Sequence, residues 1–482
     1  MMYDCPDCGK PALEIIGATD ETTEIVCHNC GRTEPVGPDD LGMGGLEWIE
    51  GQIANRIKGG LEVGNPRTTG EPPTRRDFLK TSAGAAAALG ALGRTRSAHA
   101  NDRLSIGLIG CGSRMRGSLM PLLNNYRESH NAEVTAVCDP WRQAREEAAA
   151  MCEDWYGRAP RQYVSYRDLI EDGDLDAVMI ASCDHQHTTH LKAAAEANLD
   201  AYCEKPLAKD FDGLKAAYDA VREHGVIVQN GTQVRSFASV EGAVAFFQTG
   251  ALGKISRIQQ CRNGARPYWY NYIRDVDEDD VDWAEFLMDR PMRPFDPVVY
   301  SGWYGYREFS DGPTPGYGSH FIDLAHRITG AAFPASCVAM SGVCVWDDEH
   351  GFDAPDHANV VWEYPEGFQV YYTTNFGNSS RRDFTIFGDK GIMDLTDWNN
   401  IHVSGEGAYG STDLPSEPVR VDDVERPGHI EDWLDCIRSR EEPNAGIEAG
   451  YQHAVACLMA MRASDTGRRQ IYDPAAREIR EG

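Results

Sequence analysis

The sequence predicts an α/β fold in which helices flank a largely parallel sheet. From residue 103 onward, short apolar strands alternate with helical segments, as in proteins built from βαβ units. The first strand, Leu104–Ile109, ends in a glycine-rich turn that opens a helix. Two later strands, 177–181 and 201–203, are followed by polar residues at their carboxyl ends. Ligands of open α/β sheets bind at that edge.

The composition narrows the function classes. The 482 residues are enough for two or three domains with a large core. A formal net charge of -29 argues against nucleic-acid binding and against a polybasic membrane site. Of the 14 cysteines, four form two Cys-x-x-Cys pairs near the N-terminus. The others are scattered through apolar runs, so no disulfide framework is expected.

The two N-terminal pairs predict a zinc-ribbon-like module over residues 1–35. Cys5, Cys8, Cys27 and Cys30 can point four thiolates at a single metal, and tetrahedral four-cysteine sites suit zinc. Short strands are expected at 14–16 and 24–26. A redox dithiol pair is the alternative, but it lacks a surrounding βαβ pattern. Residues 36–73 are expected to form a linker.

Residues 74–100 have the features of a twin-arginine (Tat) export signal. The sequence T-R-R-D-F-L-K precedes a short, weakly apolar run and then Ala98-His99-Ala100. Cleavage after Ala100 would give a mature chain of 101–482. We therefore expect export by the Tat machinery to the periplasm or another extracytoplasmic space, and a cytoplasmic location if this internal signal is not used. The signal begins unusually far along the chain. The alternatives are a true start further on, for instance at Met43, a cytosolic N-terminal extension, or a chance Arg-Arg pair.

The first α/β domain is expected over residues 101–230, with a nucleotide bound at its glycine turn. Gly110 and Gly112 permit a tight turn and close approach of the backbone to a pyrophosphate at a helix N-terminus. Ser113 and Arg114 follow in the same turn. The third glycine of the usual fingerprint would stand at Met115, and Gly117 is its candidate substitute after a small insertion.

An acidic residue after the second strand indicates which dinucleotide is preferred. Strand 133–138 ends in Asp139, whose carboxylate can accept hydrogen bonds from ribose hydroxyls and would repel a 2′-phosphate. We therefore predict NAD rather than NADP. Arg142 could soften this preference. The alternative role of Asp139 is a helix cap before Pro140.

These features together resemble the Gfo/Idh/MocA oxidoreductase family over residues 103 to about 470. The matching segments are I-G-L-I-G-C-G (106–112), V-C-D-P (137–140), D-A-V-M-I-A-S-C-D-H-Q-H (176–187), Y-C-E-K-P-L-A (202–208), N-G-T-Q-V-R (230–235), G-A-L-G-K-I (250–255), G-Y-G-S-H-F-I-D (316–323) and H-I-E-D-W-L-D-C-I-R-S (429–439). The resemblance implies an N-terminal Rossmann domain and a C-terminal α+β domain over 231–482, built on a large open mixed sheet, with the last helices returning to the Rossmann domain. It also implies a homo-oligomer, a dimer or a tetramer.

The resemblance assigns catalytic roles. Lys205 matches the family's lysine, which exchanges a proton with the reacting hydroxyl. Its alternative is an ion pair with Glu204. His320 matches the histidine that contacts this hydroxyl. The family's aspartate one helical turn earlier is absent, because that position is Gly316. Tyr317 and Asp323 are the candidates to compensate, and a structural salt bridge is the alternative role of Asp323.

The remaining contacts implied by the resemblance surround the same strand ends. Substrate contacts are expected from His185, Gln233 and Arg235 together with Lys205 and His320. Metal binding by His185 and His187 is a weaker alternative. Aromatic residues at 268–272 and 303–304 are either sugar-stacking platforms or packing elements. The expected cofactor-binding residues are Gly110, Gly112, Ser113, Arg114, Met115, Asp139, Ser182, Asp184, His187, Glu204 and Lys205.

The predicted function is hydride transfer between a carbon of a sugar, polyol or sugar derivative and nicotinamide C4. Free NAD is scarce outside the cytosol, so export predicts a tightly held cofactor that is regenerated within each cycle. One alternative is an NAD-dependent glycosidase that oxidises the sugar transiently, eliminates the aglycone, and then adds water and reduces the product. The other is a non-catalytic sugar-binding relative.

Overall fold

The computed structural model describes residues 14–18, 23–26, 33–36, 103–171 and 174–482. Near the N-terminus, β1 (Glu14–Ala18), β2 (Thr23–Val26) and β3 (Thr33–Val36) form an antiparallel sheet in that order. The two strands expected there are therefore present. The four cysteines of the predicted zinc site lie outside the described residues, as does the 74–100 segment.

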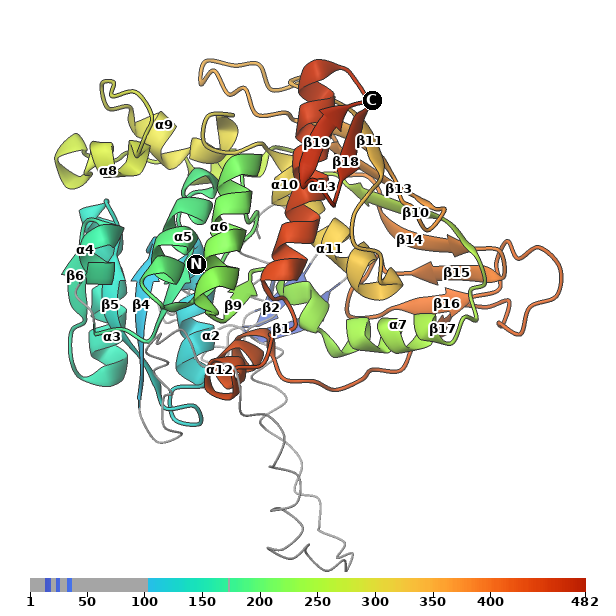
Figure 1. Ribbon diagram of the computed structural model, residues 1–482, viewed down its shortest axis with the longest axis horizontal. Coiled ribbons are helices and arrows are strands. Elements are labelled where there is room, and N and C mark those ends of the chain that lie inside the picture. Colours follow the sequence, from blue (N-terminus) through green and yellow to red (C-terminus); the bar gives the residue numbers. More distant parts are fainter. Residues whose placement is uncertain (1–13, 19–22, 27–32, 37–102, 172–173) are drawn as a thin grey trace, which may run out of the picture.

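A six-stranded, fully parallel sheet follows, as the alternating pattern predicts (Figure 1). Its central strands carry buried apolar side chains on both faces, which is typical of a parallel sheet covered by helices on both sides. In spatial order the strands are β6 (Arg161–Tyr163), β5 (Ala132–Cys138), β4 (Leu104–Ile109), β7 (Ala177–Ile180), β8 (Asp200–Cys203) and β9 (Val228–Asn230).

Helices cover both faces of this sheet because side chains of successive strand residues alternate between two apolar clusters. In β7, Val178 and Ile180 pack with α4, α5 and α6, while Ala177 and Met179 pack with α2, α3 and α12. Helix α12 comes from far along the chain. The helices are α2 (Met120–Asn125), α3 (Arg142–Tyr156), α4 (Tyr166–Glu171), α5 (His187–Glu196), α6 (Phe211–His224) and α12 (His429–Ser439).

The second half of the chain forms a ten-stranded mixed sheet, as the family resemblance implies. Only the central β10–β13 pair is parallel. In spatial order the strands are β17 (Val419–Arg420), β16 (His402–Ser404), β15 (Gly391–Asp394), β14 (Arg382–Gly388), β10 (Ile255–Arg262), β13 (Gln369–Asn375), β12 (His357–Glu363), β11 (Ser336–Gly342), β18 (Gln470–Asp473) and β19 (Glu478–Glu481).

Helices pack on one face of the ten-stranded sheet and join it to the first sheet. Side chains of α11 such as Phe321 and Leu324 pack in the same core cluster as Tyr372 of β13 and Phe384 of β14. The opposite face carries exposed side chains on β11, among them Val338 and Met340. These helices are α7 (Ala238–Gln248), α10 (Pro313–Gly316), α11 (Gly318–Thr329) and α13 (Ile447–Thr466).

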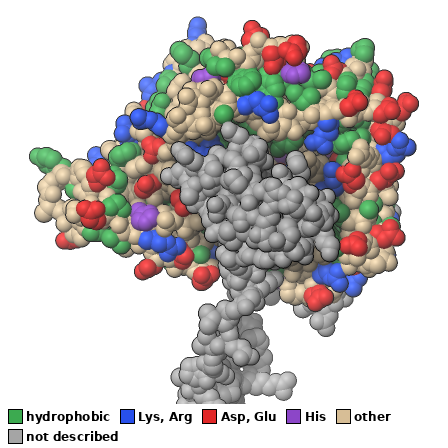
Figure 2. Space-filling view, turned by 180° about the vertical axis from the view of Figure 1, so that it is seen from behind, with side chains coloured by type: hydrophobic (Ala, Val, Ile, Leu, Met, Phe, Trp, Pro, Cys, Tyr) green, Lys and Arg blue, Asp and Glu red, His purple; other side chains and the backbone are tan. Residues whose placement is uncertain are grey.

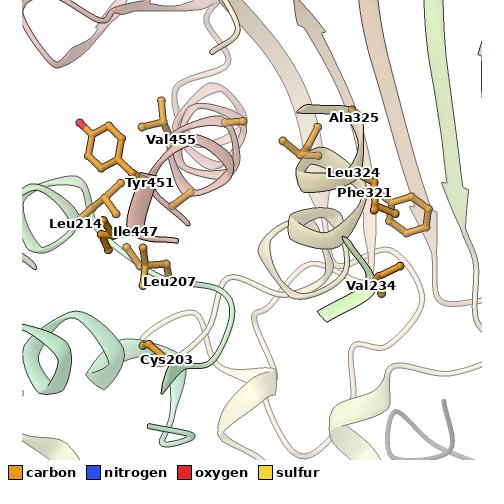
Figure 3. Packing of buried hydrophobic residues seen from close by; sticks show 14 of the residues in the cluster. Cys203, Leu207, Leu214, Val234, Phe321, Leu324, Ala325, Ile447, Tyr451 and Val455 are labelled. Carbon is orange, nitrogen blue, oxygen red and sulfur yellow. The ribbon is translucent and has the colours of Figure 1, made fainter. Parts of the chain in front are cut away.

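The long helix α13 lies between the two sheets (Figure 1). Figure 3 shows its residues Ile447 and Tyr451 beside Leu207 and Leu214 of the first domain, with Val455 further along the helix in the same cluster. The core cluster that holds these side chains also holds those around α11 and the ten-stranded sheet. The two halves of the chain therefore share one continuous apolar core.

A connection between β10 and α11 crosses to the carboxyl edge of the six-stranded sheet. It contains the short helices α8 (Trp283–Leu287) and α9 (Pro297–Ser301), which lie beside that sheet in Figure 1. Val281 forms an isolated β-bridge with Trp141, and the Asp282 amide donates to the Pro140 carbonyl at 3.0 Å. The ligand-binding edge of the first domain is therefore partly built by the second half of the chain.

The surface agrees with the acidic composition. Asp and Glu side chains are spread over the face shown in Figure 2, with Lys and Arg side chains between them. Among the described residues, no helix is both long enough and apolar enough to cross a bilayer.

Candidate active site

The glycine turn after β4 depends on Gly110 for two independent reasons. Its φ of +85° lies in the left-handed region that disfavours other residues. A Cβ there would also stand 2.5 Å from the Ser182 backbone nitrogen, at the end of β7. Gly112 differs, because a Cβ on it would meet nothing within 4 Å. The turn is therefore tight against the sheet and open on its outer side, where a pyrophosphate could approach the backbone.

The helix after the turn begins irregularly. Residues Met115–Leu119 form a π-helical turn before α2, and such a turn holds one extra residue relative to an α-helix. The π-helical turn starts at Met115, the position where the usual glycine would stand. Gly117 does not take over its packing role, because it is exposed and a Cβ on it would meet nothing. The Met115 side chain is fully buried in the apolar cluster, and Ser113 is exposed beside the turn.

Asp139 links the glycine turn after β4 to the segment that follows β5. Its carboxylate accepts hydrogen bonds from the Cys111 amide at 2.7 Å and from the Trp141 amide at 2.8 Å. Burial raises the pKa of Asp139, although both hydrogen bonds and two nearby arginines favour its ionised form. Arg142, expected to soften the cofactor preference, forms an ion pair with Asp280 instead.

Lys205 extends from the end of β8 into the space beside α10. Its side chain is buried, and its Nζ donates to the Gly316 carbonyl at 3.1 Å. The Lys205–Pro206 peptide is cis. The alternative expectation, an ion pair with Glu204, is wrong, because Glu204 pairs with Arg114 at 2.7 Å. Lys205 still interacts with Glu204 through its charge, but the hydrogen-bonded ion pair of Glu204 is with Arg114.

Glu204 and Arg114 fasten the end of β8 to the glycine turn. Arg114 Nε donates to Glu204, and the Tyr202 hydroxyl donates to the same carboxylate at 3.2 Å. Burial opposes ionisation of Glu204, but Arg114 and Lys205 outweigh it and hold its pKa below the usual range. Glu204 and Arg114 were both expected to bind the cofactor. Their side chains contact each other and fix the position of Lys205.

Asp184 is a buried acid at the carboxyl end of β7. Its Oδ2 accepts a hydrogen bond of 2.6 Å from the Ser310 hydroxyl, and it is 3% exposed. Burial raises the pKa of Asp184 to about 6, even though His187, Ser310 and Lys205 all favour its ionised form. An acid with this pKa can change its protonation near neutral pH.

The histidines of this loop face protein atoms. Both ring nitrogens of His187 point at backbone carbonyls, of Pro206 at 2.8 Å and of Ser182 at 3.0 Å. His185 donates from Nε2 to the Phe286 carbonyl at 3.0 Å, and its Nδ1 has no partner among the described residues. His187 therefore ties the Lys205–Pro206 turn to β7. The two rings do not form a metal site together with other described residues.

Replacing Asp184 with asparagine is expected to remove a pH dependence of stability. The folded-state pKa of about 6 exceeds the ordinary value of 3.8. The contribution of Asp184 to the free energy of unfolding is therefore fully present below the unfolded-state pKa. It is lost as pH rises through the folded-state pKa. Between about pH 4 and pH 7, the free energy of unfolding of the wild type should fall by about 3 kcal/mol relative to that of the Asp184→Asn variant. Urea unfolding of both proteins across this range measures the difference, and a constant difference would contradict the assignment.

His320 lies in the first turns of α11, with Lys205 nearby. Its ring is buried, and its Nδ1 has no hydrogen-bond partner among the described residues. Burial and then the charge of Lys205 keep the pKa of His320 well below its usual range, so the ring is neutral. Gly316, one turn earlier, supplies only its carbonyl to Lys205. The structure thus brings Lys205 and His320 together at α10 and α11.

Asp323 and Arg235 point to each other. Arg235 donates from its guanidinium to Asp323 at 2.6 Å, and both side chains are buried. Burial opposes ionisation of Asp323, but Arg235 and His453 hold its pKa below the usual range. Asp323 and Tyr317 were the expected substitutes for the missing aspartate. Asp323 instead forms a structural ion pair, which was the alternative role expected for it. Tyr317 lies under the Arg262 guanidinium at 5.1 Å, and Gln233 begins the short 3₁₀ helix Gln233–Ser236.

Sequence reasoning missed two residues of this site. Ser310 binds Asp184 from a distant loop that carries no motif. Tyr268 was interpreted only as part of an aromatic run, yet its hydroxyl is buried next to Gly316. The only available signal for Tyr268 was its place in that run, which sequence spacing could not connect to Gly316.

Comparisons with known proteins agree with this architecture. Residues 104–232 match the profile of an oxidoreductase family with an NAD-binding Rossmann fold, and residues 286–472 match its C-terminal alpha/beta domain. Residues 72–93 match the signal sequence of the twin-arginine translocation pathway.

Individual relatives extend the comparison. The chain is 32% identical over 353 residues to an inositol 2-dehydrogenase/D-chiro-inositol 3-dehydrogenase of Shouchella clausii, covering 71% of this chain and 87% of the relative. It is 30% identical over 149 residues to the uncharacterised oxidoreductase YrbE of Bacillus subtilis, a match to 29% of this chain and 44% of that relative. The chain thus spans less than half of the latter protein.

A solved structure shows the same fold. The WlbA dehydrogenase from Bordetella pertussis, determined in complex with NADH and UDP-GlcNAcA, has a TM-score of 0.57 at 20% identity. The superposition covers 77% of this chain and 99% of that one. Both family profiles and the long match to the inositol dehydrogenase lead to one assignment: the chain belongs to the Gfo/Idh/MocA family of oxidoreductases.

Proposed function

We propose that this protein is an NAD-dependent oxidoreductase that transfers a hydride between an alcohol carbon of a sugar, polyol or sugar derivative and nicotinamide. The observation that carries the proposal is Lys205, a buried lysine at the carboxyl end of β8, held between the glycine-turn domain and α10. The inositol dehydrogenase activity in the name of the Shouchella relative supports the substrate class.

The residues fit a dinucleotide. The open outer side of Gly112 and the left-handed Gly110 would let the pyrophosphate approach the turn, and Asp139 is the acid proposed to face the ribose hydroxyls. When bound, the nicotinamide supplies the acceptor or donor of the hydride. Ser182 and Asp184 at the end of β7 complete this edge.

The chain's own residues would handle the proton. For alcohol oxidation, Lys205 in its neutral form takes the hydroxyl proton, and for ketone reduction the ammonium returns it. Neutral His320, with a free Nδ1, can hydrogen-bond the same oxygen. Asp184, whose pKa is raised to about 6 by burial, is a second titratable group at this strand end.

NAD is the preferred cofactor in this proposal. Asp139 opposes a 2′-phosphate, and a hollow of about 370 Å³ beside it is lined by Trp141 and three further acids, Asp275, Asp277 and Asp280. Their negative charge disfavours an additional phosphate. Arg142 does not counteract this, because it is paired with Asp280.

We propose in addition that the protein is exported to the periplasm by the Tat machinery with its cofactor already bound. The signal match at 72–93 supports the route. Tat carries folded proteins, and the connection that bridges to Trp141 and Pro140 would help retain the nucleotide. A zinc site of Cys5, Cys8, Cys27 and Cys30 is a further proposal, which a zinc-release assay on the full chain tests.

Mass analysis of the purified protein tests the function first. We expect co-purified NAD rather than NADP. A panel of aldoses and cyclitols, including myo-inositol, is then added while the absorbance of reduced nicotinamide is followed. Reduction by at least one member is the expected result. Aglycone release from aryl glycosides without any net nicotinamide reduction would instead support the glycosidase alternative.

We also propose that the protein is a homo-oligomer that associates through the open face of the ten-stranded sheet. Val338 and Met340 of β11 are 46% and 78% exposed on that face. Met340→Glu is expected to shift the species toward monomers in sedimentation velocity, because it places a charge in an apolar contact. Met292→Glu, at a residue exposed elsewhere, serves as the control. An unchanged sedimentation coefficient in Met340→Glu would reject this face as the interface.

A further inference from the structure

The Tyr268 hydroxyl is a buried hydrogen-bonding group without a partner. Tyr268 belongs to the short 3₁₀ helix Tyr268–Tyr272, in the connection that crosses between the domains. It is 5% exposed, and its Oη has no hydrogen-bond partner among the described residues. Leaving a buried hydroxyl unpaired costs about 1–3 kcal/mol, so such a group calls for an explanation.

Aromatic packing fixes the direction of this hydroxyl. Four rings meet the Tyr268 ring edge-on, with centroid distances between 5.3 and 5.8 Å: Trp269, Tyr304, Tyr317 and Phe376. A ring held in this way cannot swing its hydroxyl toward solvent. The donor is therefore in place before any ligand arrives, which is the property that makes a hydrogen bond effective in stabilising a transition state.

The Tyr268 hydroxyl and Lys205 Nζ both lie against Gly316. The Gly316 carbonyl accepts the hydrogen bond from Lys205 Nζ at 3.1 Å. A Cβ at position 316 would lie only 2.6 Å from Tyr268 Oη, well inside normal contact distance. The phenol thus occupies the space that any side chain at 316 would need. Tyr268 and the lysine approach the same residue from two different segments.

The electrostatic environment keeps the phenol protonated. Burial raises the pKa of Tyr268 well above its usual range, and the nearby Asp184 carboxylate adds to this effect. The raised pKa favours the protonated phenol, which can donate an O–H hydrogen bond.

We propose that Tyr268 is a catalytic residue whose hydroxyl donates a hydrogen bond to the reacting oxygen of the substrate. The phenol occupies the space that a side chain at position 316 would need. This inference rests on the proposed function. In oxidation, the substrate C–H bond breaks and its electron pair leaves as hydride to the oxidised nicotinamide dinucleotide. The O–H proton passes to Lys205, and the C=O bond forms. Tyr268 keeps its proton and stabilises the negative charge on the oxygen during transfer.

Replacement of Tyr268 by phenylalanine tests this role. With the best substrate from the aldose and cyclitol panel, Tyr268→Phe should lower kcat and kcat/KM together by about 100-fold, because the bond acts chiefly in the transition state. Tyr306→Phe is the matched control: its ring packs in the same aromatic cluster, but its hydroxyl donates to the His350 carbonyl at 2.9 Å. That variant should stay within about twofold of the wild type.

A double-mutant cycle tests the geometry without substrate. Gly316→Ala should lower Tm by about 5 °C, since the new methyl group would collide with Tyr268 Oη. In the Tyr268→Phe background the nearest atom would be Cζ at 3.6 Å, an ordinary contact. The same Gly316→Ala change should then lower Tm by less than about 2 °C. Equal shifts in both backgrounds would overturn the proposed juxtaposition.

The kinetic outcomes separate this inference from the function on which it rests. If Tyr268→Phe keeps kcat within about twofold of the wild type while Lys205→Ala is inactive, the Tyr268 role fails and the oxidoreductase function stands. If Lys205→Ala also retains full turnover, the proposed function itself fails. A loss of at least tenfold in Tyr268→Phe, with normal nucleotide content and an unchanged Tyr306→Phe control, supports the inference.

Discussion

Replacement of Lys205 by alanine is expected to lower kcat by about 1,000-fold. General acid–base groups contribute about 10²- to 10⁴-fold to the rate, and Lys205 is the only lysine of the described residues that is buried at the carboxyl edge of the first sheet. Its Nζ is held by a hydrogen bond to the Gly316 carbonyl at 3.1 Å. The proton of the reacting hydroxyl would then have to leave without a positioned base.

Steady-state kinetics and nucleotide analysis check this prediction together. The Lys205→Ala protein should contain as much bound NAD as the wild type, because Gly110, Gly112 and Asp139 are unaffected. Lys215→Ala is a suitable control, since that lysine pairs with Asp212 at 3.0 Å on the surface of α6. Turnover by Lys205→Ala within about tenfold of the wild type would contradict the assigned proton transfer.

The second large effect concerns stability. Asp323→Ala is expected to lower the free energy of unfolding by about 3–5 kcal/mol, because it leaves the Arg235 guanidinium buried without its partner. Burial lowers the pKa of Arg235, and Asp323 is the main group that opposes this shift. The depressed pKa of Asp323 means that its contribution is present above the unfolded-state pKa and is lost as pH falls below it.

Chemical denaturation of matched variants measures the pair. Asp323→Leu combined with Arg235→Met should cost less than Asp323→Ala alone, because removing both charges leaves no buried charge unpaired. If Asp323→Ala were as stable as the wild type but inactive, the ion-pair assignment would be wrong. Asp323 would then have the catalytic role that its position beyond His320 first suggested.

Local pattern was sufficient for the elements that carry the site. Hydrophobic period and glycine placement depend only on residues that are neighbours in the sequence. These two signals predicted strand Leu104–Ile109, the glycine turn and the strand end that carries the E-K-P segment. The ten-stranded sheet was expected from the family resemblance and not from periodicity. The sequence also anticipated the returning helix α12, whose residue Trp433 packs in the cluster of the first sheet.

The partners of the site residues could not be predicted. Arg235 and Asp323 lie 88 positions apart, and Ser310 reaches Asp184 across 126. Such pairs arise when separate segments pack, and no residue spacing encodes them. The π-helical turn at Met115–Leu119 is a similar case, since nothing in the residue spacing indicated it. Tyr268 became a candidate only when its distance to Gly316 was known.

Deuterium transfer tests the central claim most directly. The purified protein is incubated with NAD⁺ and a panel of carbon-deuterated aldoses and cyclitols, and the nicotinamide nucleotide is then analysed by mass. We expect the wild type to transfer deuterium from at least one substrate to the nicotinamide, and the Lys205→Ala variant to transfer almost none. A wild-type protein that binds the nucleotide but transfers no deuterium from any member of the panel would contradict hydride transfer as its function.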